Sequence, residues 1–378
     1  MLNICRLLSQ IGKVSIAMVV PEPIDQISLA KTSNEFDVAH VALVQMTPLA
    51  GLVERVRFEL DPNCMNTQFT SIRVADREIL LKLIDDHNLV WVHTLRIANE
   101  CRIYRWPHTV LDIDDIPSRV YRSRTQIDST IVRKLLDYRM AVIWQRHERR
   151  LARRFDVTAV CSKSDSEYLG TTGRFRIIPN GCALPKEQPN RVYSVPPRVG
   201  FIGWFKWMPN VDGVEWFLQS VWPLVKIRIP EARLRLVGGD SDRDFSTAGP
   251  DVDCLGYLAD PGGEIATWSA MIVPVRVGGG TRVKIAQAFS QKCPVVSTPL
   301  GAFGYDVIDG EEILIANDPQ SFSAACAKLI EDPQFGATMA ENAWSKFLTN
   351  WTWTSIGYAV ESVVEQCLAS RRGYDVLP

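Results

Sequence analysis

Two hydrophobic patterns alternate along this chain. Short, nearly continuous apolar runs rich in β-branched residues predict buried strands, and the stretches between them carry apolar residues at helical spacing. Strands are predicted at residues 13–20, 38–44, 89–93, 109–113, 157–161, 175–178, 198–202, 232–237, 271–275, 294–297 and 313–315. Helices are predicted at residues 2–12, 76–86, 131–155, 211–225, 281–291, 321–330, 333–348 and 354–369. Because strands alternate with helices, the pattern indicates an α/β protein with parallel sheets covered on both faces.

The alternation is interrupted once, at residues 181–197. This segment carries four prolines and no periodicity, which is typical of a linker. We therefore expect an N-terminal domain at residues 1–180 and a C-terminal domain at residues 198–354, with the helix at 355–378 packing back on the first domain. A length of 378 residues accommodates two such domains. Two doubly wound sheets predict ligand binding at the carboxyl ends of the strands, in a cleft.

Composition narrows the class of protein. A hydrophobic content of 46%, a charged content of 22% and a formal net charge of -1 give no general attraction to nucleic acid. Nine cysteines without C-x-x-C pairs indicate reduced thiols in a cytosol and no zinc site. The longest apolar run near the start is far too short to span a bilayer, and no signal peptide precedes it. We expect a soluble cytoplasmic protein that is at most peripheral at the inner face of the membrane.

The strongest chemical signal is a glycine-rich turn between a predicted strand and helix, PVRVGGGTRVK at residues 274–284. Glycines let a backbone approach an anion closely, and the N–H groups that begin a helix attract negative charge. The turn is neither a Walker loop nor a G-x-G-x-x-G turn. With Thr281 predicted as the N-cap, Lys284 and Gln287 share one helix face. Two cations in the first turn, Arg282 and Lys284, oppose the helix dipole unless an anion lies between them and the amides. The turn therefore predicts a diphosphate site, and the alternative is an ordinary loop and an amphipathic helix with solvated cations.

From Gly200 to about Trp353 the sequence resembles the family-four (group 1) glycosyltransferases. The similarity lies in the glycine-rich turn, in PVVST at residues 294–298, in Gly301-Ala302, in GFIG at 200–203 and in PNVDGV at 209–214. The resemblance implies the glycosyltransferase-B fold, with two Rossmann-like domains facing each other across a cleft. It also implies retaining transfer of a sugar from a nucleoside diphosphate sugar to a hydroxyl acceptor, with no required metal ion, in bacterial polysaccharide, glycolipid or glycoconjugate synthesis.

A weaker match upstream, at DIDD (residues 112–115), CSKSD (161–165) and IPNG (178–181), extends this resemblance. It implies that Asp114 approaches the reacting sugar and that Asp115 orients the acceptor or the backbone. We assign catalysis to these two aspartates and to Arg282 and Lys284, which stabilise negative charge on the leaving diphosphate. Donor binding is assigned to Gly203, Trp204, Lys206, Gly279, Gly280, Thr281, Arg282, Lys284 and Gln287.

The sequence departs from the family in three places. Gln287 stands where the family has a glutamate that accepts hydrogen bonds from the ribose hydroxyls. Phe303 replaces the glutamate of the Gly-Ala-Glu-Gly segment that many members of the family have. The opening strand and glycine loop are missing before the helix at 2–12, so either the start is misassigned or the element is lost. These departures keep open a donor-binding but inactive homologue that serves as a partner subunit. A nucleotide-sugar epimerase of the same shape is a second rival, although we identify no acid and base residues for it.

Two charged segments have alternative interpretations. The acids at 112, 114 and 115 follow a strand, so besides a catalytic role they can bind a divalent cation, as Asp-x-Asp pairs do, or cap loops. The predicted helix at 131–155 carries eight Lys and Arg residues between Arg133 and Arg154, with apolar residues at helical spacing. Such a helix can contact an anionic membrane, as in transferases with lipid-linked acceptors, or pack on its own sheet with a solvated basic face. The five histidines are expected in packing or at the surface.

Overall fold

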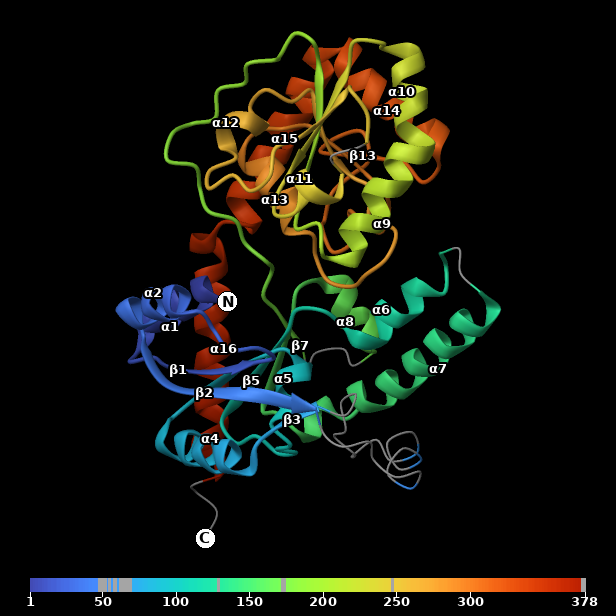
Figure 1. Ribbon diagram of the computed structural model, residues 1–378. Coiled ribbons are helices and arrows are strands. Elements are labelled where there is room, and N and C mark those ends of the chain that lie inside the picture. Colours follow the sequence, from blue (N-terminus) through green and yellow to red (C-terminus); the bar gives the residue numbers. More distant parts are fainter. Residues whose placement is uncertain are drawn as a thin grey trace. The chain divides into compact units, whose positions relative to one another are not determined.

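The chain forms two compact units. The computed structural model describes residues 1–46, 70–127, 130–170, 175–245 and 248–374, together with Val53, Val56 and Leu60. Unit 1 contains residues 1–118, 136–178 and 357–378, and unit 2 contains residues 119–135 and 179–356 (Figure 1). Residues 119–135 thus cluster with unit 2, which differs from the boundary drawn from the sequence.

Unit 1 is built on two sheets. The first has the order β1-β2-β3, with β1 and β2 parallel and β3 antiparallel. The second is fully parallel and has the order β4-β5-β6-β7. The strands are β1 Ser15–Val20, β2 Asp37–Met46, β3 Thr70–Ile72, β4 Val90–His93, β5 Thr109–Ile113, β6 Val157–Val160 and β7 Phe175–Ile177. Every residue of β5 and β6 is buried, which explains their mostly apolar sequences.

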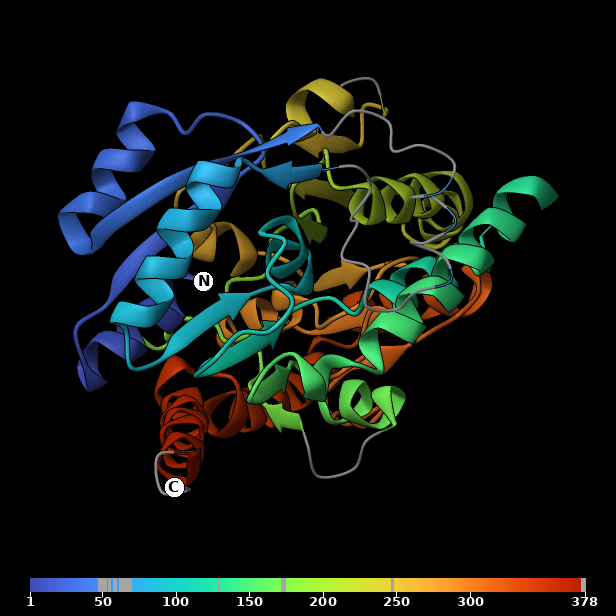
Figure 2. The same ribbon diagram turned by 90° about the horizontal axis from the view of Figure 1, so that it is seen from below.

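The helices of unit 1 include both the first and the last helix of the chain. They are α1 Leu2–Ile11, α2 Gln26–Glu35, α4 Val74–Asp86, α5 Leu95–Glu100, η1 Leu151–Arg153 and α8 Lys163–Leu169, with most of α7 Ile131–Glu148 and α16 Trp353–Tyr374. In Figure 2, α4 runs beside the strands of the N-terminal part, where it packs against β2. Helix α16 buries Val360, Val363 and Cys367, and the Gln366 amide oxygen accepts a hydrogen bond from Arg176 at 2.5 Å.

Helix α7 differs from the predicted one. It ends at Glu148, and the chain continues in the short turn η1. Its second half buries apolar side chains such as Ile143 and Trp144, as expected for packing within the unit. Its first half instead exposes large apolar side chains, namely Ile131, Val132, Leu135, Leu136 and Tyr138. None of the described helices combines the length and apolar character needed to cross a membrane.

Unit 2 contains a six-stranded parallel sheet with the order β10-β9-β8-β11-β12-β13. Its strands are β8 Arg198–Ile202, β9 Arg233–Val237, β10 Val252–Cys254, β11 Ala270–Val273, β12 Val295–Ser297 and β13 Leu314–Ile315. From β8 the chain runs outward through β9 and β10, and it then returns to β11 on the other side. The sheet is therefore doubly wound, and its switch point lies between β8 and β11, where such sheets bind ligands at the carboxyl ends of their strands.

Helices cover both faces of the unit 2 sheet. They are α9 Met208–Trp216, the π-helical turn η2 Phe217–Val221, α10 Trp222–Arg228, α11 Ser241–Asp244, α12 Gly262–Ile265, α13 Val283–Ser290, α14 Pro319–Glu331 and α15 Pro333–Asn350, joined by residues of α6 Pro117–Arg124. Alternate residues of β11 enter different cores: Ala270 and Ile272 join one cluster, and Met271 and Val273 join the other. This double burial confirms the predicted parallel sheet with two covered faces.

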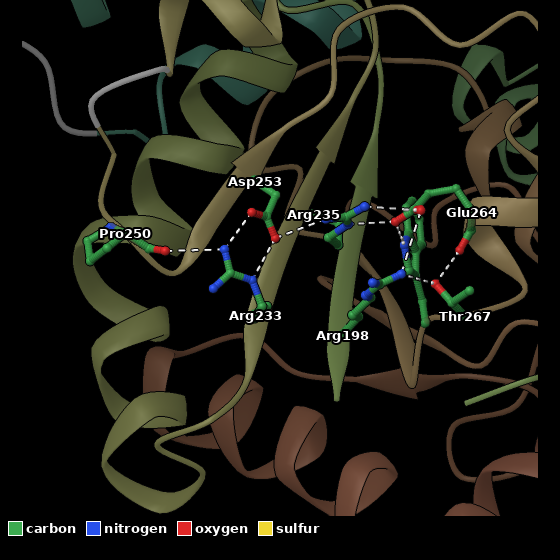
Figure 3. A network of polar contacts seen from close by, with 8 residues as sticks. Arg198, Arg233, Arg235, Pro250, Asp253, Glu264 and Thr267 are labelled. Atoms are coloured by element: carbon green, nitrogen blue, oxygen red, sulfur yellow. Dashed lines mark hydrogen bonds and ion pairs between the residues drawn. The ribbon is translucent and has the colours of Figure 1, made fainter. Parts of the chain in front are cut away.

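Paired ions occupy part of one face of the sheet, at β8, β9 and β10 (Figure 3). Arg235 lies between two acids: its Nε is 2.6 Å from Glu264 Oε1, and its Nη1 is 3.0 Å from Asp253 Oδ2. Arg233 binds the same Asp253 through Nε at 2.8 Å. Glu264 also accepts a hydrogen bond from the Trp268 indole at 2.9 Å. Arg198 of β8 approaches the same Glu264, with its Nη1 3.8 Å from Oε2, so each acid of this network has at least two partners.

Candidate functional site

The glycine-rich turn follows β11 at the switch point of unit 2. Gly278, Gly279 and Gly280 are buried, and Gly278 and Gly280 have φ of +128° and +67°, which side chains rarely permit. The Gly278 N–H donates to the Ser123 hydroxyl of α6 at 2.9 Å. Within the described part of the chain, the N–H groups of Gly279, Gly280, Thr281, Val283 and Lys284 meet no acceptor. A row of N–H donors thus lines the turn and the start of α13.

The prediction that Thr281 caps this helix is wrong. Helix α13 begins at Val283 with Arg282 as its N-cap, and no side chain caps it. The Thr281 hydroxyl instead accepts a hydrogen bond from the Asn180 side-chain amide at 3.2 Å. Tyr305 fixes the helix start, because its hydroxyl donates to the Arg282 carbonyl at 2.9 Å and accepts the Ala286 N–H at 3.3 Å.

Lys284 is a partly buried cation beside these amides. Its Nζ donates to Asn210 Oδ1 at 2.8 Å and lies 3.7 Å from the centroid of the Phe201 ring. Burial holds the pKa of Lys284 well below its ordinary value, and the positive charge of Arg282 lowers it further. No carboxylate of the described residues forms an ion pair with Lys284. A partly desolvated charge without a counter-ion is costly, so this position favours an added anion.

Arg282 and Gln287 flank Lys284 along the chain. The Arg282 guanidinium folds back over the turn and donates from Nη1 to the Gly279 carbonyl. Gln287 is partly buried in α13, and its amide makes no hydrogen bond to another residue that the structure describes. The structure thus places both residues next to the turn that the sequence predicted.

The carboxyl end of β8 contributes the other side of this site. A Cβ on Gly203 would lie 2.7 Å from Asn210 Nδ2 and 3.1 Å from Lys284 Nζ, so only glycine lets these side chains approach the strand. Trp204 is 57% exposed, and its indole N–H donates to Asp240 Oδ2 at 3.1 Å. Lys206 binds the same carboxylate at 3.3 Å. Gly203 and Lys284 are therefore brought together, while Trp204 and Lys206 share Asp240 after β9.

Comparison with known families agrees with this geometry. Residues 196–332, which include the turn and both strands of the switch point, match the model described as "Glycosyl transferases group 1". Over these residues the chain is similar to the group 1 glycosyl transferases. The trehalose synthase of Rubrobacter xylanophilus is 26% identical over 150 residues, which are 34% of this chain. That match spans only 36% of the relative's own length.

Solved structures extend the likeness to the whole chain. Sucrose-phosphate synthase from Thermosynechococcus elongatus superposes with a TM-score of 0.69 at 17% identity, over 97% of this chain and 92% of that one. HepE from Anabaena, solved with UDP and glucose, gives a TM-score of 0.60 at 15% identity, over 96% and 94%. The glycosyltransferase-B fold predicted from the sequence is thereby confirmed, and the match to the group 1 glycosyl transferases lies in unit 2.

A second contact within unit 2 involves a position where the sequence departs from the family. The guanidinium carbon of Arg119, from α6, lies 3.4 Å from the centroid of the Phe303 ring. Such stacking is favourable for arginine on an aromatic face. The sequence analysis did not anticipate it, because the two residues are far apart in the chain and no local pattern connects them.

In unit 1, Asp114 and Asp115 follow β5 directly and are partly buried. Cys161 approaches Asp114, with its Sγ 3.6 Å from Oδ1, and burial raises the pKa of this thiol well above its ordinary value. Among the described residues, no three His, Cys, Asp or Glu side chains are grouped so that they could hold a metal ion. These acids belong to unit 1 and the donor residues to unit 2.

One polar pair at the end of β4 was missed by sequence reasoning. His93 Nδ1 lies 3.3 Å from Asp112 Oδ2, because β4 and β5 are parallel neighbours in which these residues are paired in register. The next residue, Thr94, has φ 72° and ψ 140°, a strained conformation for a β-branched residue. The only signal in the sequence is that both polar residues end apolar runs, which requires knowing that the two strands pair.

Proposed function

We propose that this protein is a glycosyltransferase that moves a sugar from a nucleoside diphosphate sugar to a hydroxyl acceptor. The observation that carries the proposal is the partly buried Lys284 without a counter-ion, beside a row of N–H donors at the switch point of a domain that matches the group 1 glycosyl transferases. A diphosphate satisfies both features, because it supplies negative charge and many acceptor oxygens. The activities of the named relatives, and the UDP bound to HepE, agree with this substrate class.

In the proposed reaction, Lys284, Arg282 and the amides that follow Gly278 stabilise the charge that develops on the leaving diphosphate. Gln287 accepts a ribose hydroxyl, and Trp204 and Lys206 flank the donor. Asp114 approaches the reacting sugar, and Asp115 orients the acceptor or the backbone. Retention of configuration, the absence of a required metal ion, and a role in bacterial polysaccharide, glycolipid or glycoconjugate synthesis come from the family resemblance alone.

Calorimetric titration with UDP, GDP, uridine and guanosine tests the donor site. Lys284→Ala or Arg282→Ala should each weaken binding of the preferred diphosphate by about 1.5–3 kcal/mol and leave its nucleoside almost unchanged, because charge-assisted hydrogen bonds to phosphate are lost. Lys328→Ala is a matched control, since Lys328 Nζ also lies 3.7 Å from a phenylalanine ring, that of Phe335 in α15. Equal diphosphate affinity in all these proteins, or none in the unmodified chain, would contradict the proposal.

We also propose that the acceptor is lipid-linked and that the exposed apolar half of α7 contacts an anionic membrane at the cytoplasmic face. The support is the row of exposed apolar side chains at residues 131–138, interleaved with the basic residues Arg133, Lys134 and Arg139. Apolar side chains can enter the headgroup region while basic ones bind anionic lipid, and each basic residue near the surface contributes about 1 kcal/mol.

Vesicle sedimentation tests this membrane contact. Binding should require phosphatidylserine, weaken with salt and fall in a Leu135→Ser, Leu136→Ser double variant. Ile227→Ser is the control, because Ile227 is an apolar residue of α10 that is 78% exposed and lies far from α7 in the sequence. Absence of binding to anionic vesicles, or equal binding by the double variant, would show that α7 does not dock on lipid.

A further inference from the structure

Asn210 connects the partly buried Lys284 to the end of β8. It is the third residue of α9 and is only 8% exposed. Its side-chain Nδ2 donates to the Trp204 carbonyl at 2.9 Å, while its Oδ1 accepts from Lys284 Nζ at 2.8 Å. Because the NH2 group is engaged by a carbonyl, the amide oxygen is the atom that must face the ammonium group. The side chain therefore holds Lys284 from a fixed point of the backbone.

Helix α9 also contacts a second cation of the glycine-rich segment, but through a carboxylate. Arg276, eight residues before Lys284, forms a two-pronged ion pair with Asp212 of α9, at 3.1 Å and 2.7 Å. Helix α9 thus offers a carboxylate to Arg276 and a neutral amide to Lys284. A carboxylate neutralises the cation that it binds, whereas an amide oxygen fixes the ammonium group and leaves its charge available to another anion.

We infer that Asn210 is a positioning residue, which aims the charged Lys284 side chain at the donor diphosphate without neutralising it. The inference rests on the proposed function of the glycine-rich turn. The role of Asn210 is distinct from that of Lys284, because Asn210 is expected to affect nucleotide binding only by holding the lysine. Both side chains approach Gly203 so closely that a Cβ at this position would displace them.

The inference predicts how nucleotide affinity depends on pH. The groups that face Lys284 from β8 and α9 are Phe201 and Asn210, which do not titrate, and the charged group that acts on it is Arg282. Since burial and Arg282 lower the pKa of Lys284, UDP affinity should fall as the pH rises through that pKa. A carboxylate at position 210 should raise the pKa, and an alanine, which removes the acceptor of the charged form, should lower it.

The experiment measures UDP affinity by calorimetry from pH 7 to pH 10 for the full chain, Asn210→Asp, Asn210→Ala and Lys284→Ala. At pH 7 both Asn210 variants should bind UDP about tenfold more weakly, the first because the lysine is neutralised and the second because it is no longer held. The fall in affinity should move to higher pH in Asn210→Asp and to lower pH in Asn210→Ala. Lys284→Ala should show no such fall.

Opposite displacements of the two profiles support the inference, and a loss of packing alone would not produce them. If Asn210→Ala unfolds below the assay temperature, the test rests on Asn210→Asp alone, in which the fall in UDP affinity should move to higher pH. If UDP binding depends on Lys284 but the profiles of the Asn210 variants coincide with that of the unmodified chain, the inference is overturned and the proposed function stands. If the unmodified chain binds no UDP, or Lys284→Ala binds it equally well, both are overturned.

Discussion

Replacing Arg235 by methionine is expected to destabilise unit 2 by about 2–3 kcal/mol. The side chain of Arg235 is 15% exposed and contacts both Asp253 and Glu264. Removing one partner of a buried ion pair costs about 3–5 kcal/mol when the other charge is left alone. Here Asp253 retains Arg233, and Glu264 retains Arg198 and the Trp268 indole, so the loss should fall below that range.

Arg233→Met is the matched comparison. Arg233 binds one acid, Asp253, and the Pro250 carbonyl, and 34% of its side chain is accessible; Asp253 keeps Arg235 when Arg233 is removed. Screening by solvent makes such a pair worth no more than about 1 kcal/mol. The two variants remove the same type of side chain from the same strand. The difference between their losses in free energy of unfolding therefore reports the greater burial of Arg235 and its contact with a second acid.

Acidification should remove much of this difference. Hydrogen bonds from Arg233 hold the pKa of Asp253 below its ordinary value, against burial, which acts to raise it. Burial also acts to raise the pKa of Glu264, but hydrogen bonds from Arg235 and Trp268 outweigh it and leave that pKa lowered. Groups with a lowered folded-state pKa contribute stability above their unfolded values, about 3.9 for Asp and 4.3 for Glu, and lose it as the pH falls through the folded values.

The assay is urea unfolding followed by tryptophan fluorescence, at pH 7.5 and at about pH 3.5. Most of the eleven tryptophans lie in unit 2, so this signal reports the unit that carries the substitution. Equal losses for Arg235→Met and Arg233→Met at pH 7.5 would refute the reasoning from burial. A loss for Arg235→Met that is unchanged at pH 3.5 would refute the reasoning from charge.

Three further predictions concern single residues. Gln287→Glu should tighten both uridine and UDP by about 1 kcal/mol in calorimetry, because a carboxylate accepts ribose hydroxyls more strongly than an amide, and unchanged affinities would remove Gln287 from the ribose site. Thr94→Gly should be more stable than Thr94→Ala by about 1 kcal/mol in urea unfolding, since both lose the bond to the Ile97 N–H but only glycine relieves the positive φ, and equal stabilities would deny that strain. Burial raises the pKa of Cys101 to about 12, so mass spectrometry should find it unmodified by iodoacetamide at pH 8 until urea unfolds the chain, and rapid labelling of the native protein would contradict its burial.

The parallel sheets were predictable from the sequence because strands buried on both faces must be continuous apolar runs. The strands at 109–113 and 198–202 coincide with their predicted bounds, and the others agree to within a few residues. The glycine-rich turn was also predictable, since the chemistry of anion binding requires glycines and helix-start amides that are adjacent in the chain. Features that depend on residues adjacent in the chain were therefore predicted from the sequence.

Features that depend on contacts between residues far apart in the sequence were not predicted. The true start of α13 depends on Asn180 and Tyr305, which engage Thr281 and the first turn from elsewhere in the chain. The short strand β10 is set by pairing with β9 and by the ion pair between Arg233 and Asp253, and its sequence carries no strong apolar pattern. The predicted helix at 211–225 divides at the π-helical turn η2, before a second helix that begins at Trp222. Asn210 lies in the PNVDGV segment that resembles the family, but its role was not predicted for the same reason, because it depends on contact with Lys284.

The path of the chain through its two units has a consequence for biosynthesis. Unit 1 includes the residues of α16 from Gly357 onward, whereas every residue of unit 2 lies between 119 and 356. A ribosome therefore delivers all of unit 2 before it delivers the last helix of unit 1. Domains usually fold in the order in which they emerge, but here the unit that starts first is completed last. The apolar positions that α16 covers must wait for that helix, so a nascent chain stalled before residue 357 is the species for which chaperones would compete.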